Sequence, residues 1–384
     1  PEDRSCDLFS TGFIRSSVAG HGSHVHGLIA ANHANSDATL GACKRCGLAS
    51  ARVAFEECNF DSTVLTRMNS AALWSALTIQ VQIGVQVVNM SLGGGFSGIQ
   101  RYCSLYPGNT ECLALALAEE NGVLVVAAAG NERTALNFPA RDPRVLSVGG
   151  LDEGLDLWNE DKDPPPAHRN GCPDFPNTES GCGSNFTQVV GVDAPQALVA
   201  PARRVRSTFY PGMVWNAYTQ TGCRDDVLGE NGSGQGLCTG TSMSSPMVAG
   251  IAGLLRSINP LLPPGQGEFG ALQPGIHDVL LQAAVPPVGL DWSARFGYGS
   301  PSAGIATSML LGAVEGQRVR NRLTPVFSLY ASAAKDWAYT NVPQAALALM
   351  RHQSAGYVPA GPLTPGYAAF PSAAPAPAPP APRA

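Results

Sequence analysis

Apolar positions recur at two spacings between about residue 20 and residue 260, and these spacings predict alternating strands and helices. Short apolar runs typical of buried strands occur at 85–89, 123–128 and 145–148. Helical patterns occupy 63–82 and 111–121, and Gly122 ends the second of them. Strands and helices that alternate in this way predict an α/β fold of three layers, with helices flanking a mostly parallel central sheet.

A further helix is predicted just after Gly240, where apolar residues recur at spacings of three and four until Pro260 ends the run. Ser242 then lies in its first turn, where unpaired backbone N–H groups and the helix dipole favour negative charge. A nucleophile at this position would have help in stabilising an oxyanion. An isolated Gly-Thr-Ser sequence is also typical of a helix cap, so the meaning of Ser242 depends on the rest of the chain.

The composition is that of a globular protein with a substantial core. Of 384 residues, 44% are hydrophobic and 14% are charged, and the formal net charge is −5. Because there is no basic block, the sequence gives no reason to expect nucleic acid or an anionic membrane as a partner. There is no apolar run of about eighteen residues, so we expect no segment to span a bilayer. We also expect a monomer.

Ten cysteines are too many for an ordinary cytosolic enzyme, and they predict disulfides in a secreted, extracellular or periplasmic protein. The short-range pairs are Cys103 with Cys112, Cys172 with Cys182, and Cys223 with Cys238. Cys43 and Cys46 have the C-x-x-C spacing of zinc and redox sites, but no second C-x-x-C follows, so zinc is the less favoured alternative. Cys6 and Cys58 have no obvious local partners.

The organisation changes along the chain. Two stretches rich in Gly, Pro, Asp and Asn, 152–184 and 209–237, are predicted to be long loops. The helix and strand pattern weakens after residue 305, so we treat 1–305 as the main domain and 306–352 as a C-terminal extension. Residues 353–384 are dominated by Ala and Pro, a composition that buries too little apolar surface to fold, and we expect a disordered tail.

Three further segments carry residue types suited to nucleophilic catalysis. In GHGSHVHG (20–27), His21 stands at a predicted helix start, where its imidazole is free to take a proton from a serine. In VNMSLGGG (88–95), a strand runs into glycines that let an extended peptide approach. In VVAAAGNE (125–132), a buried strand ends in small residues and in Asn131, whose amide is a potential donor to an oxyanion. A structural histidine and a simple turn asparagine remain the alternatives.

Together with GTSMSSPMVAG (240–250), these blocks resemble, in this order, the four signature blocks of the subtilisin-like serine proteases (subtilases, peptidase family S8). The resemblance covers about residues 15–305, and Phe296-Gly297-Tyr298-Gly299 resembles the segment that closes the family's catalytic domain. It implies a subtilisin-like fold, no cofactor, polypeptide substrates, and peptide hydrolysis through an acyl-enzyme.

The resemblance also implies a role for each residue of the blocks. Ser242 would be the nucleophile, His21 its general base, and Asn131 would form the oxyanion hole with the backbone N–H of Ser242. The walls of the substrate cleft and of the S1 pocket, which receives the P1 side chain, would be Ser91, Leu92 and Gly93 on one side and Ala128, Ala129 and Gly130 on the other.

The chain departs from the family at the triad aspartate, which normally ends an apolar strand well before the histidine block. Only Asp3 and Asp7 precede His21, and neither follows an apolar strand. We therefore expect the acid and the first strand to lie upstream of Pro1, so that 1–305 is an N-terminally incomplete catalytic domain. In a subtilisin, loss of this aspartate lowers turnover by about 3 × 10⁴-fold, so we expect the chain as given to be poorly active.

Two further points follow from the resemblance. Many family members bind calcium through an acid near the position of Ala200 and Pro201, but Ala197 and Leu198 stand there, so calcium is not supported by the sequence. The alternative function is a catalytically impaired subtilisin-fold binding module, although His21, Asn131 and Ser242 are all present. An α/β-hydrolase esterase is remote, because the serine block is not G-x-S-x-G.

Overall fold

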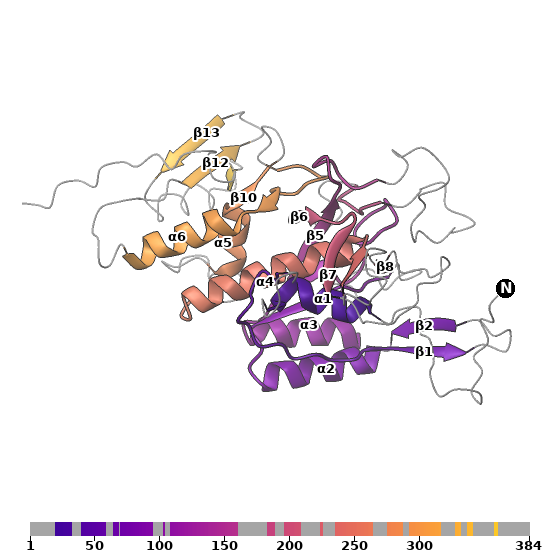
Figure 1. Cartoon of the computed structure of the whole chain (residues 1–384). Coiled ribbons are helices and arrows are strands. Elements are labelled where there is room, and N and C mark those ends of the chain that lie inside the picture. The colour runs from indigo at the N-terminus through magenta and orange to yellow at the C-terminus, as the bar shows by residue number, and fades with distance from the viewer. Residues whose placement is uncertain are drawn as a thin grey trace, which may run out of the picture.

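The computed structural model describes residues 20–32, 40–58, 64–68, 70–94, 103, 108–159, 183–188, 196–208, 223–225, 235–263, 275–286, 292–315, 327–331, 336–340 and 357–359. Its centre is a four-stranded parallel sheet in the order β3-β4-β5-β6 (Figure 1). These strands are β3 (Val87–Met90), β4 (Leu124–Ala128), β5 (Val145–Leu151) and β6 (Leu198–Pro201). Strands β4 and β5 are buried along their whole length, as expected for parallel strands covered on both faces.

Helices cover both faces of this sheet. Alternate residues of β4 enter different hydrophobic clusters, because successive side chains of a strand point to opposite faces: Val126 packs with one group of helices and Val125 with the other. The first group is α4 (Thr241–Ile258), α5 (Ile276–Gln282) and α6 (Ala303–Glu315), and the second is α2 (Ser70–Gln82) and α3 (Thr110–Glu120). In Figure 1, α2 and α3 lie side by side, away from α5 and α6. The predicted three-layer α/β fold is confirmed.

The predicted elements are present with shifted bounds, and one of them required a larger correction. The helix predicted at 63–82 begins only at Ser70, because β2 (Val64–Met68) instead pairs antiparallel with β1 (Ala54–Cys58). Val64 and Thr66 are β-branched residues, which favour strands over helices. Helix α3 begins after Asn109, whose side chain accepts a hydrogen bond from the N–H of Glu111 at 2.8 Å.

The loop predicted at 209–237 contains two short strands, which is a second correction. A small antiparallel sheet in the order β7-β9-β8 consists of β7 (Val205–Thr208), β8 (Cys223–Asp225) and β9 (Gln235–Cys238). Cys223 lies opposite Cys238 in its register, and Cys238 is disulfide-bonded. Helix α1 (His21–Ala30) packs against β7 and α4, so this sheet covers the start of the helix that carries His21.

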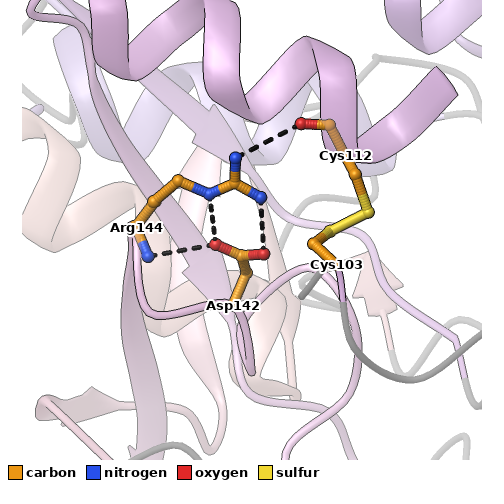
Figure 2. Close-up of polar contacts among 4 residues, drawn as sticks. All are labelled: Cys103, Cys112, Asp142 and Arg144. Atoms are coloured by element: carbon orange, nitrogen blue, oxygen red, sulfur yellow. Dashed lines mark hydrogen bonds and ion pairs between the residues drawn. A yellow bond between two sulfur atoms is a disulfide. The ribbon is translucent and has the colours of Figure 1, made fainter. Parts of the chain in front are cut away.

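Two disulfides join residues of known placement. Cys103 is bonded to Cys112, which confirms that predicted pair, and Cys43 is bonded to Cys46, which excludes zinc binding by these thiols in this state. Figure 2 shows Cys103–Cys112 beside an ion pair in which Arg144 Nε and Nη2 donate to the two oxygens of Asp142, at 2.7 and 2.8 Å. The same guanidinium donates to the backbone oxygen of Cys112 at 3.4 Å, so it ties the turn before β5 to α3. Cys6, Cys172 and Cys182 lie outside the described residues.

The C-terminal part contributes to the core beyond residue 305. Helix α6 crosses that position, and its Ala306 and Leu310 are buried in the cluster that also holds α4. A three-stranded sheet follows, with β12 (Phe327–Ala331), β13 (Asp336–Thr340) and β14 (Tyr357–Pro359). Strand β14 falls within the predicted tail, where antiparallel pairing with β12 satisfies its backbone groups. Residues 360–384 lie outside the described part.

The last pair of strands is β10 (Ala284–Val285) with β11 (Ser300–Pro301). Among the described helices, none has both the length and the apolar character needed to cross a bilayer.

Candidate active site

Helices α1 and α4 present their first turns at the same end of the molecule. His21 is the first residue of α1, and Ser242 is the second residue of α4. Val25 and Met243 share one buried cluster, and further along both helices Gly250 lies against the backbone of Ile29. Because these contacts advance along both helices in the same direction, the helices run in parallel. The predicted base and nucleophile therefore both lie at the N-terminal ends of neighbouring helices.

Strands β3 and β4 bring the two predicted cleft walls to one edge of the sheet. They are adjacent and parallel, with Met90 opposite Ala127, so the segments after them, 91–93 and 128–130, leave the sheet together. Ser91 reaches the start of α4: its Oγ donates to the backbone oxygen of Ser242 at 2.7 Å and lies 3.0 Å from Ser245 Oγ. Ser242 Oγ in turn makes a longer contact of 3.4 Å with the backbone oxygen of Ser91. Leu92 packs against the α2–α3 side of the core.

Asn131 is held with its amide oriented for donation. Its Oδ1 accepts from both the N–H and the Oγ1 of Thr241, each at 2.9 Å. Since a backbone N–H only donates, the oxygen must face Thr241, and Nδ2 must face away from it. Among the described residues, Nδ2 has no acceptor, so it is a free donor on a side chain that is held by Thr241, the residue just before Ser242. Gly240 precedes this turn and has a φ of 148°. A Cβ added to Gly240 would lie 3.5 Å from Asn131 Nδ2.

The histidines of the first block have different environments. His24 is fully buried, and its Nε2 lies 2.9 Å from the backbone oxygen of Val205 and 3.2 Å from that of Gly236. Both partners only accept, so Nε2 carries the hydrogen, and the buried Nδ1 has no partner within the part of the chain that the structure describes. His24 therefore fastens α1 to the β7–β9 sheet and has a structural role. His21, at the helix start, is half-buried and is the accessible one of the two.

Burial controls the ionisation of both imidazoles. It lowers the pKa of His21, which keeps this side chain neutral and able to accept a proton at neutral pH. It lowers the pKa of His24 to about 4, helped by the neighbouring His21 and opposed by the carbonyl groups of Val205 and Gly236. His21 has no carboxylate partner in the part of the chain that the structure describes. Asp3 and Asp7 lie outside that part.

The structure adds residues that the sequence did not single out. Thr241 belongs to the recognised serine block, but only its contacts with Asn131 reveal a task beyond capping. Glu132 follows Asn131 directly, and its Oε2 accepts from the N–H of Asn131 at 2.9 Å. Asn137 and Asn185 also donate to that oxygen, and Asn185 lies beyond a long loop, so no local pattern marks it.

No group of three or more His, Cys, Asp or Glu side chains that could hold a metal ion occurs within the described residues. The absence of a cofactor and of calcium stays a prediction.

Comparison with known proteins identifies the family of this chain. The sequence model of the subtilase family matches residues 11–299. The chain is 28% identical over 257 residues to subtilisin DY of Bacillus licheniformis, which covers 64% of this chain and 67% of the relative. It is 28% identical over 241 residues to thermitase of Thermoactinomyces vulgaris, covering 62% and 61%. With subtilisin-like protease 7 of Trichophyton verrucosum, the alignment is 28% identical over 273 residues and covers 69% of this chain but 47% of the relative.

Solved structures with a similar course of the chain are also proteases by title. They include a lanthipeptide protease, with a TM-score of 0.49, 20% identity and coverage of 76% of this chain and 75% of the other. The patellamide maturation protease PatA has a TM-score of 0.48 and 23% identity, with coverage of 78% and 88%. The family match spans well over half of the chain and includes all four blocks. The chain therefore belongs to the subtilase family.

Proposed function

We propose that this protein is a serine endopeptidase that hydrolyses peptide bonds through an acyl-enzyme on Ser242. The observation that carries the proposal is that Thr241, the residue just before Ser242, holds the amide oxygen of Asn131, so that Nδ2 is turned away from Thr241 as a donor without an acceptor among the described residues. The first turn of α4 adds the N–H of Ser242 and the positive end of the helix dipole. Negative charge is therefore stabilised where the carbonyl oxygen of a peptide under attack would carry it.

The proposed reaction has two halves. Ser242 Oγ bonds to the carbonyl carbon of the scissile peptide while His21 takes the hydroxyl proton, and the oxyanion is held by Asn131 Nδ2 and the N–H of Ser242. The C–N bond then breaks as His21 passes its proton to the leaving amine. A water molecule attacks the acyl-enzyme in the second half, with His21 again as base, and returns Ser242 to its free form. The lowered pKa of His21 favours the neutral base that both halves need.

The substrate is proposed to bind as an extended peptide between the two strand ends. Ser91, Leu92 and Gly93 would form one wall, and Ala128, Ala129 and Gly130 the other. Ser91 and Gly130 are half-buried, so both stay accessible next to Ser242 and Asn131. Backbone groups at these strand ends are suited to pairing with a peptide main chain.

A fluorophosphonate probe, which phosphonylates activated serines, tests this proposal. We expect Ser242 of the chain to be labelled slowly, because His21 has no carboxylate partner among the described residues, and Ser242→Ala to lose the label. Ser244→Ala is the matched control, because Ser244 is buried and its Oγ donates to the backbone oxygens of Ala200 and Pro201 at 3.0 and 3.1 Å. This control should keep the label. Absence of labelling in a folded protein would favour the binding-module alternative. The observation that motivates this alternative is that His21 has no carboxylate partner among the described residues.

We also propose that the protein acts in an oxidising compartment, as a secreted, extracellular or periplasmic protein. The disulfides Cys43–Cys46 and Cys103–Cys112 support this, because such bonds persist where thiols are not kept reduced. Thiol-alkylation mass spectrometry on protein isolated from its source would test it. Alkylation of these cysteines without prior reduction would contradict the proposal.

A further inference from the structure

The turn at 42–46 lies between the end of α1 and the middle of α4. The N–H of Ala42 donates to the backbone oxygen of Leu28 at 3.0 Å. The N–H of Cys43 donates to the backbone oxygen of Ile29 at 2.7 Å. Both acceptors belong to the last turn of α1, whose carbonyl groups have no partner inside the helix. The turn therefore holds the C-terminal end of α1 in place.

Helix α4 packs against the same turn with two glycines. A Cβ added to Gly250 would lie 2.8 Å from Ala42 Cβ. A Cβ added to Gly253 would lie 2.8 Å from Cys46 Sγ and 3.6 Å from Cys43 Sγ. These glycines are three residues apart, so they lie on one face of the helix. The Cys43–Cys46 disulfide is thus in contact with the backbone of the helix that carries the proposed nucleophile.

The two cysteines of this bridge differ in exposure. Cys43 is buried, whereas Cys46 is half-buried and is the one that a thiol in solution can reach. Lys44 and Arg45, which stand between them, are exposed and form no ion pair with any described residue. Cationic side chains next to a sulfur attract an attacking thiolate and favour the thiolate form of a released cysteine. The bridge therefore has the surroundings of an exchangeable disulfide.

The Cys103–Cys112 bridge has a different place in the fold. Both of its cysteines pack with α2 and α3, which cover the face of the sheet opposite to α4. Opening this bond would therefore leave the contact between α1 and α4 intact. It provides an internal comparison for the bridge at 43–46.

We infer that Cys46 is a thiol–disulfide exchange site, and that its bond to Cys43 controls the packing of α1 on α4 and with it the activity proposed for Ser242. The bond is closed in the oxidising compartment proposed above, and it opens where thiols are kept reduced. The reagent that opens it is a dithiol, and the reagent that closes it is a disulfide.

The exchange proceeds in two displacements at sulfur. A thiolate of the dithiol bonds to Cys46 Sγ, the S–S bond breaks, and Cys43 leaves as a thiolate that takes up a proton. The second thiol of the reagent then displaces Cys46 from the mixed disulfide. Two electrons have passed from the dithiol to the bridge, which now consists of two thiols, and the reagent has become a disulfide.

Opening the bond has a consequence for the proposed active site. Sulfur atoms that are no longer bonded separate to roughly the 3.5–4.0 Å of a non-bonded contact. On the side of α4, Gly253 leaves no room even for a methyl group, so the turn and the helix have to move apart. His21 lies on α1 and Ser242 on α4, and a misplacement of about 1 Å costs up to about a hundredfold in rate. This effect on activity rests on the proposed function, whereas the exchange itself does not.

A first experiment measures the exchange in the folded full chain. The protein is treated with dithiothreitol without denaturant, alkylated, and analysed by peptide mass spectrometry. We expect Cys43 and Cys46 to be alkylated together. The double variant Lys44→Gln/Arg45→Gln should slow this reaction several-fold, because it removes the two cations and leaves both sulfurs. Protection of both cysteines until the protein unfolds, or an unchanged rate in the double variant, would overturn the inference.

A second experiment follows the packing by amide hydrogen exchange, which requires no activity. On reduction, the amides of Ala42 and Cys43 should exchange faster by on the order of tenfold, because their bonds to the end of α1 open more often. The variant Cys103→Ala/Cys112→Ala should respond in the same way. The variant Cys43→Ala/Cys46→Ala should not respond to dithiothreitol, and a response in it would contradict the assignment.

Kinetics then connect the bridge to the proposed chemistry. Reduction should lower kcat/KM for a peptide substrate by on the order of tenfold or more, and oxidised glutathione should restore it. An unchanged kcat/KM in the reduced chain overturns the link to activity. If no peptide is hydrolysed but the amides respond, the peptidase proposal fails and the control of packing stands. Unchanged amide exchange after complete reduction overturns the inference even where hydrolysis is observed. If Cys43→Ala/Cys46→Ala does not fold, reduction and reoxidation of the unaltered chain decide.

Discussion

Acidification is expected to destabilise the fold through His24. This imidazole has a pKa of about 4 in the folded protein, against 6.5 when it is exposed, mainly because it is buried. As the pH falls through 6.5, the unfolded chain binds a proton that the folded protein does not bind until about pH 4. The unfolded state then holds more protons, so the free energy of unfolding decreases as the pH falls through this window.

The magnitude follows from the two pKa values. At about 1.4 kcal/mol for each pKa unit, the step from 6.5 to about 4 corresponds to a loss of about 3 kcal/mol between neutral pH and pH 4. The loss has a structural cause, because a proton on the buried Nδ1 would meet no acceptor among the residues of described placement. Nε2 already donates to the backbone oxygens of Val205 and Gly236.

Urea unfolding between pH 4 and pH 7 measures this effect, with His24→Gln as the non-titrating variant. The carboxyl groups contribute equally to both proteins, so the stability difference between them should shrink by about 3 kcal/mol from pH 7 to pH 4. Ser207→Ala is the control, because Ser207 Oγ donates to the backbone oxygen of His24 at 2.7 Å. This substitution loosens the contact between α1 and β7 but removes no titrating group. Its curve should run parallel to that of the unaltered protein. A parallel curve for His24→Gln would refute the reasoning.

Three further predictions concern the site and its supports. Asn131→Ala should lower kcat by about 10²–10³-fold, the magnitude known for this donor in a subtilisin. Thr241→Val should lower kcat less, because the N–H of Thr241 still orients the amide of Asn131. Steady-state kinetics measures both effects. The fall of kcat/KM on the acid side of its pH profile should occur below pH 6.5, because burial lowers the pKa of His21 and the neutral base persists to lower pH. A fall that begins above pH 6.5 would contradict this. Cys46→Ser should lower the melting temperature by several degrees, because the bond to Cys43 closes a four-residue loop worth about 2 kcal/mol; calorimetry measures it.

The sequence predicted the parts of the fold that depend on local patterns. Buried parallel strands are apolar throughout, so β4 and β5 were recognisable, and Gly122 marked the end of α3. The start of α2 was predicted too early because the apolar residues of 64–68 fit a helix as well as a strand. Only their pairing with β1, a contact between separate segments, decides between the two.

The candidate site divides in the same way. His21, Asn131 and Ser242 belong to contiguous blocks and could be named from the sequence, whereas their supports arise from contacts across the chain. Thr241 is 110 residues from Asn131, and Asn185 is 53 residues from Glu132. Hydrogen bonds over such distances depend on how strand ends and helix starts converge, which no local pattern contains.

These supports converge on the proposed oxyanion donor. Asn131 is fixed from two sides, its side chain by Thr241 and its backbone N–H by Glu132. Glu132 Oε2 is itself held by the side-chain amides of Asn137 and Asn185. The carboxylate that holds the backbone of Asn131 therefore depends on two further segments of the chain, which is why the donor can be fixed before a substrate arrives.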